Sequence, residues 1–298
     1  MPRMNSQRNF VVGFAMVVVW CALATLTMAQ APSTPLTVRP LRGGVYWTQG
    51  GDGGNTGFII GSDGVTVIDA KTTPSSAKEM LADLAKLTPK PVTHVILTHS
   101  DADHVNGLAA FPKGLTIISQ EGCKKEMEAS LTGNMPAPRD YFPTHTVGTT
   151  ESLKINGVRV EFHHWANAHT SGDLITYLPD LKIVFVGDIV STNQVYTGIH
   201  PLKGGSSAGW IETVKGILAL DADTIVPGHG DLQTKADLQK RLESVQDRRT
   251  KIQQLAVQGK SLDEVWQALG VTEKAGVMTS GAPYPTFTEV VYQEFAKK

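Results

Sequence analysis

The chain has 298 residues, of which 41% are hydrophobic and 18% are charged, a composition that provides enough apolar material for a sizeable core. Its formal net charge of -1 at pH 7 supplies no large cationic field for gathering nucleic acid or anionic lipid, so we expect neither as a partner. The only two cysteines are Cys21, which falls in the N-terminal leader, and Cys123. The remaining chain must therefore rely on its core, and on any bound metal, rather than on an internal disulfide.

The first residues have the layout of a secretory signal. Arg3 and Arg8 precede an apolar run that starts at Phe10, and small residues surround Ala29. A positive start, an apolar middle and a small-residue cleavage site are the features of an exported precursor. We therefore predict a signal peptide at residues 1–29, cleaved after Ala29, and a periplasmic or secreted protein with no stable membrane association. An uncleaved anchor is the alternative, because the run approaches the length that spans a bilayer.

The rest of the chain alternates between short β-rich runs and helical patterns. Residues 30–40 are expected to form a flexible lead-in rich in Pro, Ser and Thr, followed by one domain over 41–298 with a helical C-terminal tail. Clusters of β-branched and aromatic residues predict strands at 45–47, 58–60, 65–68, 94–97, 116–119, 158–163, 174–178, 182–186 and 224–226. Apolar residues at helical spacing predict helices at 75–87, 121–131, 209–220, 261–269 and 287–297. Two similar halves of this kind indicate two sheets packed face to face with helices outside.

Ligand-type side chains crowd into one segment, His99-Ser100-Asp101-Ala102-Asp103-His104, directly after the predicted strand that ends at Leu97. Imidazole and carboxylate are the usual ligands of zinc and related divalent ions. Carboxylates packed this closely repel one another unless a cation lies among them. The alternative is a polar surface loop in which Asp103 caps a short helix.

Three further ligand-type residues lie where predicted strands stop. His169 lies in the stretch AHTSGD, Asp188 follows the apolar strand in FVGD, and His229 lies in PGHG. In α/β folds, sites assemble at the ends of strands. For any single residue the surface-loop interpretation would be preferred, but the complete set favours a metal site.

From about residue 40 to residue 232 the chain resembles the metallo-β-lactamase superfamily. The family's first motif is usually His-x-His-x-Asp-His, and here it reads His99-x-Asp101-x-Asp103-His104, while AHTSGD, FVGD and PGHG match in family order. Asp69 resembles the family's strand-end aspartate, which supports the site loop without binding metal. The resemblance implies an α/β fold of the four-layer αβ/βα type, in which two mixed β-sheets pack together and helices cover the outer faces.

The resemblance also implies a centre for two divalent metal ions, zinc first, with iron and manganese as alternatives. Its ligands would be three residues for one ion (His99, Asp101, His169), three for the other (Asp103, His104, His229) and one shared by both (Asp188). A metal-bound hydroxide is then the expected nucleophile. Asp103 is the expected catalytic residue, because its carboxylate can orient that hydroxide and pass the proton to the leaving group.

Asp101 departs from the family's pattern, because a carboxylate replaces a neutral imidazole beside the first metal. The added negative charge should bind a hard cation well but make it a weaker Lewis acid. Three outcomes are open: a site that still holds two zinc ions, a preference for iron or manganese, or a weak first site that leaves one ion at Asp103, His104 and His229.

These residues predict an exported metal-dependent hydrolase that cleaves a small-molecule amide or ester. A β-lactam is the named candidate, because β-lactams act outside the cytoplasmic membrane. Lactones, thioesters and phosphoesters are alternative substrates for the same site. A metal-binding protein with little hydrolytic activity is the alternative from a different class, and Asp101 is the feature that favours it. Fold alone does not select among the substrates, since the loops over the metals do so.

Overall fold

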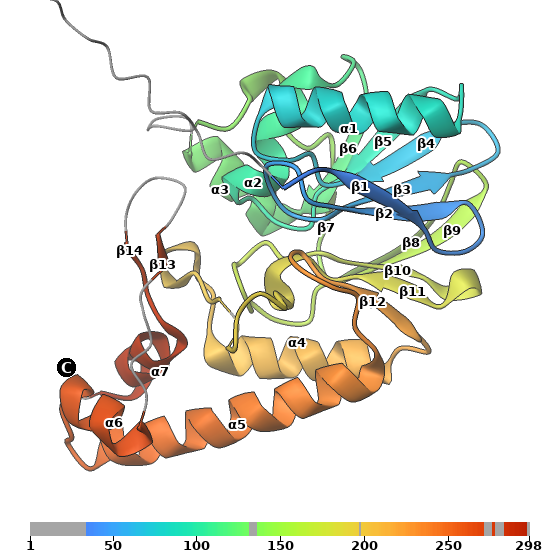
Figure 1. The fold of residues 1–298 in the computed structure, drawn as a ribbon. Helices are drawn as coiled ribbons and strands as arrows, with labels where there is room; N and C mark the ends of the chain where they lie inside the picture. Colours follow the sequence, from blue (N-terminus) through green and yellow to red (C-terminus); the bar gives the residue numbers. More distant parts are fainter. Residues whose placement is uncertain (1–33, 131–135, 197, 271–275, 278–282, 297–298) are drawn as a thin grey trace, which may run out of the picture. The chain divides into compact units, whose positions relative to one another are not determined.

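The computed structural model describes residues 34–130, 136–196, 198–270, 276–277 and 283–296 (Figure 1). The predicted signal peptide, its alternative as an anchor, and the beginning of the lead-in lie outside these residues. Within the described ranges, no helix combines the length and the apolar character that crossing a bilayer requires.

A seven-stranded mixed sheet forms the first half of the domain, with its strands in sequence order. Neighbouring strands are antiparallel from β1 to β4 and parallel from β4 to β7. The strands are β1 (Thr37–Pro40), β2 (Val45–Gln49), β3 (Thr56–Ile60), β4 (Val65–Ile68), β5 (Val92–Ile96), β6 (Thr116–Gln120) and β7 (His145–Val147). Helix α1 (Pro74–Leu87) connects β4 to β5, and α3 (Glu121–Ala129) follows β6.

A five-stranded mixed sheet forms the second half, in the order β12-β11-β10-β9-β8. Its strands are antiparallel from β8 to β11, and β12 runs parallel to β11. The strands are β8 (Thr150–Ile155), β9 (Val158–His163), β10 (Ile175–Leu178), β11 (Ile183–Phe185) and β12 (Thr224–Val226). Helix α4 (Ser207–Ala219) lies between β11 and β12 in the chain, and the long helix α5 (Lys235–Val257) follows β12.

Three buried clusters of apolar side chains separate four layers. One lies between the two sheets and includes Trp47 and Ile96 from the first sheet and Phe162 and Phe185 from the second. A second cluster joins the first sheet to α1 and α3, and a third joins the second sheet to α4 and α5. Figure 1 shows α1 over the first sheet and α4 and α5 over the second. The predicted αβ/βα sandwich of two mixed sheets is therefore confirmed.

Several strands differ from the prediction, among them β7, which was not predicted. Residues 37–40, expected in the flexible lead-in, form β1, which pairs with β2 and places Val38 opposite Thr48. The segment forms a strand because hydrogen bonds to β2 stabilise it, whatever its own composition. Pro40 is tolerated because β1 is an edge strand. Strand β8 was not predicted either. Its polar residues alternate with partly buried ones, as expected for the exposed edge of a sheet.

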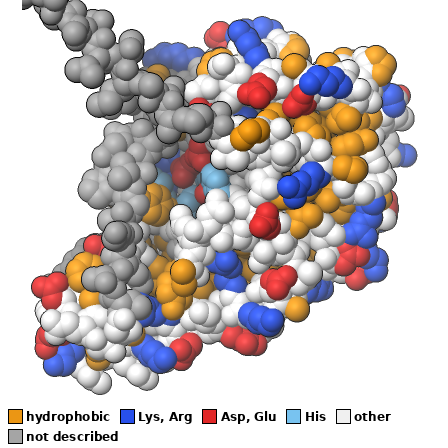
Figure 2. Space-filling model, viewed as in Figure 1, with side chains coloured by type: hydrophobic (Ala, Val, Ile, Leu, Met, Phe, Trp, Pro, Cys, Tyr) orange, Lys and Arg blue, Asp and Glu red, His pale blue; other side chains and the backbone are white. Residues whose placement is uncertain are grey.

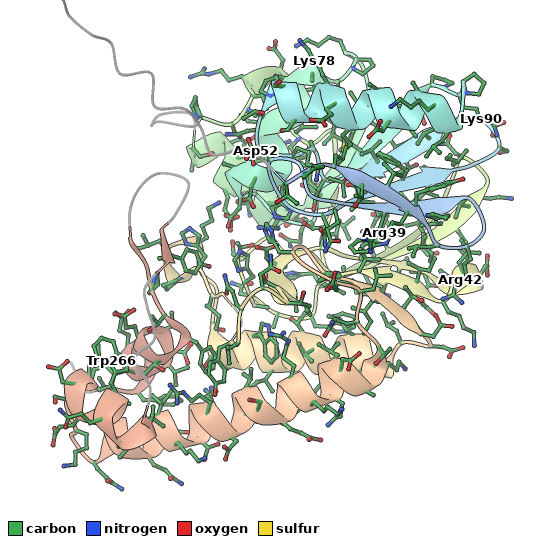
Figure 3. The ribbon with its side chains drawn as sticks, in the orientation of Figure 1. Arg39, Arg42, Asp52, Lys78, Lys90 and Trp266 are labelled. Carbon is green, nitrogen blue, oxygen red and sulfur yellow. The ribbon has the colours of Figure 1, made fainter. Side chains whose placement is uncertain are left out.

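Helices make up most of the described C-terminal tail, but two short strands that were not predicted interrupt them. Helices α6 (Leu262–Leu269) and α7 (Phe287–Phe295) follow α5, and the short strands β13 (Gly276–Val277) and β14 (Pro283–Tyr284) lie between them. Gly270 ends α6 in the left-handed conformation with a φ of 64°, which glycine adopts without steric cost. Trp266 on α6 lies away from the two sheets (Figure 3).

The loops that carry the predicted ligands come from both sheets. His99 follows β5 in the first sheet, and His169 lies between β9 and β10 in the second. Asp188 follows β11, and His229 follows β12. Residues from distant parts of the chain therefore meet where the strands of the two packed sheets end.

Candidate metal centre

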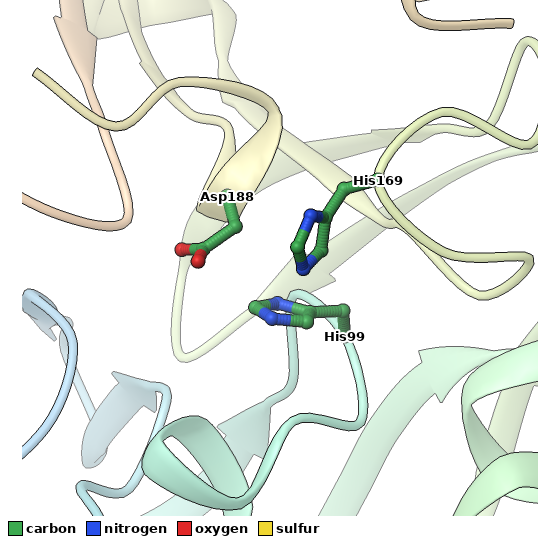
Figure 4. Close-up of side chains that lie close together, drawn as sticks. All are labelled: His99, His169 and Asp188. Atoms are coloured by element: carbon green, nitrogen blue, oxygen red, sulfur yellow. The ribbon is translucent and has the colours of Figure 1, made fainter. Parts of the chain in front are cut away.

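Six of the seven predicted ligands form two groups of three, and within each group the ligand atoms lie within 4.8 Å of one another. The first cluster is His99, His169 and Asp188 (Figure 4). The second cluster is Asp103, His104 and His229. Asp188 also reaches the second cluster, with Oδ1 3.2 Å from His104 Nε2 and Oδ2 3.4 Å from His229 Nε2. Its carboxylate thus lies between the clusters, where a bridging ligand would be.

Asp101, the seventh predicted ligand, faces the first cluster with one carboxylate oxygen. Its Oδ2 lies 3.2 Å from His169 Nε2 and 3.7 Å from His99 Nε2. Its Oδ1 accepts a hydrogen bond of 2.5 Å from the Lys203 ammonium. One oxygen is therefore directed toward a prospective metal and the other is already bound.

The helix-capping alternative for this segment does not hold. Helix α2 (Ala102–Val105) has Asp101 at its N-cap, but the side chain of Asp101 makes no capping hydrogen bond. Asp103 lies inside the first turn of α2 and its Oδ2 lies 3.1 Å from His229 Nε2. Both carboxylates thus face the imidazoles rather than the helix backbone.

Asp69 braces the first motif from beneath, as the resemblance implied. Its Oδ1 accepts from the Thr98 backbone N–H at 2.8 Å, and its Oδ2 accepts from Thr98 Oγ1 at 2.7 Å. Oδ2 also lies 2.8 Å from His104 Nδ1. When Nδ1 donates to this carboxylate, the tautomer of His104 is fixed and the lone pair of Nε2 is directed into the second cluster.

The AHTSGD stretch forms a tight turn that presents His169. Asp173 accepts from the backbone N–H groups of Ala168 and Thr170, and the Thr170 hydroxyl donates to it at 2.7 Å. His169 Nδ1 lies 3.0 Å from the carbonyl oxygen of Gly198, which can only accept. Nδ1 therefore carries a proton, and Nε2, which lies 3.2 Å from Asp101 Oδ2, is the nitrogen directed toward the cluster.

Two glycines allow the backbone to approach the ligands closely. A Cβ atom at Gly54 would lie 2.3 Å from Cε1 of His104, and one at Gly228 would lie 2.0 Å from Oδ1 of Asp188. Both distances are far below van der Waals contact, so a larger residue at either position would displace a ligand. The glycine-rich loop at residues 50–55 therefore forms part of the wall of the second cluster.

A buried lysine lies beneath this loop. Lys71 Nζ donates to the carbonyl oxygens of Gly50 at 2.8 Å and Gly54 at 2.7 Å. Burial lowers the pKa of Lys71 to about 8, although the carboxylates of Asp69 and Asp52 oppose the shift. Asp52 is labelled on the loop in Figure 3. The sequence analysis missed Lys71, because a lysine two residues after a strand-end aspartate has no distinguishing pattern.

Unpartnered atoms at the centre test whether the residues fit a metal. His99 Nε2, His104 Nε2 and Asp188 Oδ1 are buried and have no hydrogen-bond partner among the described residues. Buried polar atoms of this kind are rare, and each costs free energy unless something binds it. Imidazole nitrogens and carboxylate oxygens that converge in this way fit divalent ions, which would accept their lone pairs.

The pKa shifts of the predicted ligands also indicate a site that favours positive charge. Burial disfavours the ionised form of Asp188, but His229 and His104 outweigh it and hold the pKa of that carboxyl well below its usual range. The charge of Asp188 in turn leads the causes that raise the pKa of His229 to about 10. For His169, burial is outweighed by the hydrogen bond to Asp101, and the pKa rises to about 9. The ligand set thus favours positive charge at its centre, which protons on the imidazoles or divalent ions can supply.

A segment from residue 198 to residue 206 brings a further charged group to the first cluster. The His200 N–H donates to the His169 carbonyl at 2.8 Å, and the Ser206 N–H donates to the Ala168 carbonyl at 3.0 Å. This docking places Lys203 against Asp101. Lys203 was not predicted, because no local pattern connects it with a residue 102 positions earlier in the chain.

Two aromatic side chains complete this side of the centre. The Tyr284 hydroxyl in β14 lies 3.5 Å from His169 Nδ1. The rings of Tyr284 and His200 meet edge to face, with centroids 5.5 Å apart. His200 is buried beside His169. Tyr284 was missed, because it reaches the centre from the C-terminal tail.

Comparisons with known proteins agree with this geometry. A family model described as "Metallo-beta-lactamase superfamily" matches residues 49–229. The alpha subunit of 2,4-dinitroanisole O-demethylase from Nocardioides sp. (strain JS1661) is 30% identical over 197 residues, which cover 65% of this chain and 57% of that protein. The metallo-beta-lactamase type 2 of Bacillus sp. (strain 170) is 25% identical over 185 residues, which cover 61% of this chain and 68% of that one.

A solved structure shares the fold. The structure of a stereoselective inverting sec-alkylsulfatase from Pseudomonas sp. superposes with a TM-score of 0.69 at 16% sequence identity. The match covers 88% of this chain but 50% of the sulfatase. This chain therefore spans about half the length of the sulfatase and 57% of the length of the O-demethylase subunit.

Proposed function

Because this chain belongs to the metallo-beta-lactamase superfamily, whose members are generally metallo-hydrolases, we propose that it is an exported hydrolase that cleaves a small-molecule amide or ester, with a β-lactam as the first candidate. The observation that carries the proposal is the convergence of two buried imidazole nitrogens, on His99 and His104, with a buried oxygen of Asp188, none of which makes a hydrogen bond within the described residues. Such a set is suited to binding metal.

The two clusters would each hold one divalent ion, zinc first, with Asp188 shared between them and Asp101 adding one oxygen to the first cluster. Ions bound there lower the pKa of a water molecule and polarise the bond to be cleaved. Asp103 would orient the attacking water and carry a proton to the leaving group, because its carboxylate lies at the centre and remains partly accessible.

The exposure of the ligands indicates where a substrate approaches. The side chains of His99 and His104 are 1% and 0% exposed, whereas those of Asp103 and His229 are 25% and 26% exposed. Figure 2 shows histidine and acidic side chains gathered at one place on this face. Of the predicted ligands, Asp103 and His229 are therefore the ones that an approaching small molecule would meet first.

A second candidate is cleavage of a small ether or of an alkyl sulfate. It is favoured by two of the similar proteins, one named as an O-demethylase subunit and the other as a sec-alkylsulfatase. Lactones, thioesters and phosphoesters complete the set of substrates that a centre of this kind could act on.

The test of hydrolysis is a substrate panel assayed with zinc-loaded protein. A chromogenic cephalosporin is compared with a 4-nitrophenyl ester, a lactone, a thioester, 4-nitrophenyl phosphate, an alkyl sulfate and a nitroaryl methyl ether. We expect turnover that a chelator abolishes and added zinc restores, and none from Asp188→Asn purified in parallel. Zinc-loaded protein that turns over no member of the panel would contradict the hydrolase and favour a metal-binding protein.

Export is tested separately. Expression of the full chain in a Gram-negative host, followed by fractionation and N-terminal sequencing, should yield periplasmic protein that begins at Gln30. Recovery from the cytoplasm with Met1 retained would contradict export, and recovery from the membrane with the leader retained would support the uncleaved anchor.

A further inference from the structure

Lys203 is placed unlike the surface lysines of this chain. It ends the short helix η5 (Pro201–Lys203), and its ammonium lies 2.5 Å from Asp101 Oδ1 and 2.8 Å from Ser100 Oγ. The side chains of Lys203 and Asp101 are 22% and 18% exposed, whereas those of the Lys182–Asp221 pair are 51% and 82% exposed. Holding a long side chain in one conformation costs entropy, so the ordered ammonium requires an explanation.

A hydrogen-bond network holds this ammonium from three parts of the fold. Ser100 Oγ accepts from Lys203 and donates to Glu126 Oε2 on α3 at 2.5 Å. Glu126 Oε1 accepts from the Ser171 hydroxyl at 2.6 Å. The Ser171 N–H in turn donates to the Lys203 carbonyl at 2.7 Å, which closes the circuit. Lys203 is therefore fixed relative to both the first motif and the AHTSGD turn.

The consequence falls on Asp101. Its Oδ1 is committed to the ammonium, so its Oδ2, which faces His169 and His99, is the oxygen left for a metal. The Asp101–Lys203 pair has no net charge, like the neutral imidazole that the family usually has at this position. An uncompensated carboxylate would instead reduce the Lewis acidity of the metal that it binds.

We propose that Lys203 is a positioning residue of the first cluster, which makes Asp101 a one-oxygen, charge-compensated metal ligand. The proposal rests on the metal centre of the proposed function but not on any particular substrate. Removing the ammonium frees the second oxygen and leaves one negative charge uncompensated. The first ion is then bound more tightly but activates water less, so affinity and rate move in opposite directions.

The experiment is a zinc titration of full-length Lys203→Met against a chromophoric chelator, with kcat measured on the best substrate of the panel. We expect the dissociation constant of one of the two zinc ions to fall by about tenfold, as expected for one unit charge a few ångströms from a divalent ion in a well-screened site. We expect kcat to fall by a similar factor. Lys182→Met, the same change in an exposed ion pair, should alter neither quantity.

Repeating the Lys203→Met change in a protein that lacks the Asp101 carboxylate tests whether the effect depends on that carboxylate. In Asp101→His there is no carboxylate for Lys203 to orient, so Lys203→Met should there change zinc affinity only through the charge of the ammonium and should leave kcat within about twofold. A loss of kcat as large in Asp101→His as in the unaltered background would overturn the proposal, as would weaker zinc binding with a lowered melting temperature, which a merely structural lysine predicts. If the zinc affinities shift as expected but no substrate is turned over, the proposed hydrolytic function is contradicted and the proposed role of Lys203 is retained. Absence of zinc binding by the unaltered protein would contradict both the proposed function and the role of Lys203.

Discussion

The two clusters use the same types of ligand but balance their charges differently. In the second cluster, the ion-pair partners of Asp103 are the imidazoles of His104 and His229, and Asp69 braces His104 from behind. In the first cluster, Asp101 meets an ammonium from the protein itself. A divalent ion in the second cluster would therefore face imidazoles and carboxylates alone, whereas one in the first would share a carboxylate with Lys203. Two sites with similar ligands can therefore differ in net charge, because the residues that contact the ligands contribute to that charge.

The largest expected effect comes from removing the residue that the clusters share. Asp188→Asn loses a charged oxygen from both clusters, so we expect kcat/KM to fall by about a thousandfold. The rise in melting temperature that zinc produces should disappear with it. Asp180→Asn, a change on an exposed carboxylate, is the control. Two tightly held zinc ions in Asp188→Asn would show that Asp188 does not bridge.

A smaller and less symmetrical effect is expected at Asp69. An amide in Asp69→Asn cannot accept all the hydrogen bonds that the carboxylate accepts from Thr98 and His104. We expect zinc affinity at the second cluster to fall by about 10- to 100-fold, as for other outer partners of ligating histidines, with a smaller loss at the first cluster. Stepwise chelator titration measures both. Equal losses at the two clusters would refute the specific pairing of Asp69 with His104.

Two lysines near the clusters, the buried Lys71 and the partly buried Lys203, extend the comparison to the effect of pH. Lys203 contacts a carboxylate, whereas Lys71 contacts two carbonyl oxygens and has its pKa lowered to about 8 from the ordinary 10.5. Between these values the unfolded chain binds more protons at Lys71 than the folded chain does, so folding stability contributed by this group rises with pH. From pH 7 to pH 10 the gain is about 2 kcal/mol.

Urea unfolding of the unaltered protein and of Lys71→Met at several pH values checks this sign. The free energy of unfolding of the unaltered protein should rise relative to that of Lys71→Met as the pH increases from 7 to 10. Parallel pH profiles would mean that the lysine retains its ordinary pKa in the folded state.

The smallest expected change is steric and confined to the second cluster. In Gly54→Ala the new Cβ would press on the buried ring of His104, and overpacking of this kind corresponds to about a tenfold loss of affinity for the second ion. Gly148→Ala, where the nearest atom to the new Cβ is 3.9 Å away, is the matched control. Equal zinc stoichiometry and affinity in both variants would show that the loop yields without moving His104.

The sequence predicted those residues of the centre whose position follows from the end of a nearby strand. Ligand-type residues at the ends of apolar strands were placed together because strand ends share an edge. Asp69 was identified by its resemblance to the family's strand-end aspartate. Their role as metal ligands stays a prediction. Lys203 and Tyr284 could not be foreseen, because each reaches the centre through contacts between distant segments. Strand β1 was missed for the same reason, since its conformation depends on its pairing with β2.

The placement of ligands on both sheets gives bound ions a mechanical role. An ion in the first cluster would link a loop of the first sheet to two loops of the second, and an ion in the second cluster would link it to one, across long stretches of intervening chain. Such a link acts as a reversible staple, because it removes conformational freedom that the unfolded chain would otherwise regain. Cys123, the single cysteine in the described residues, is buried and unpaired, so no disulfide does this work there. The lifetime of the folded chain against proteolysis would then track the supply of metal around it.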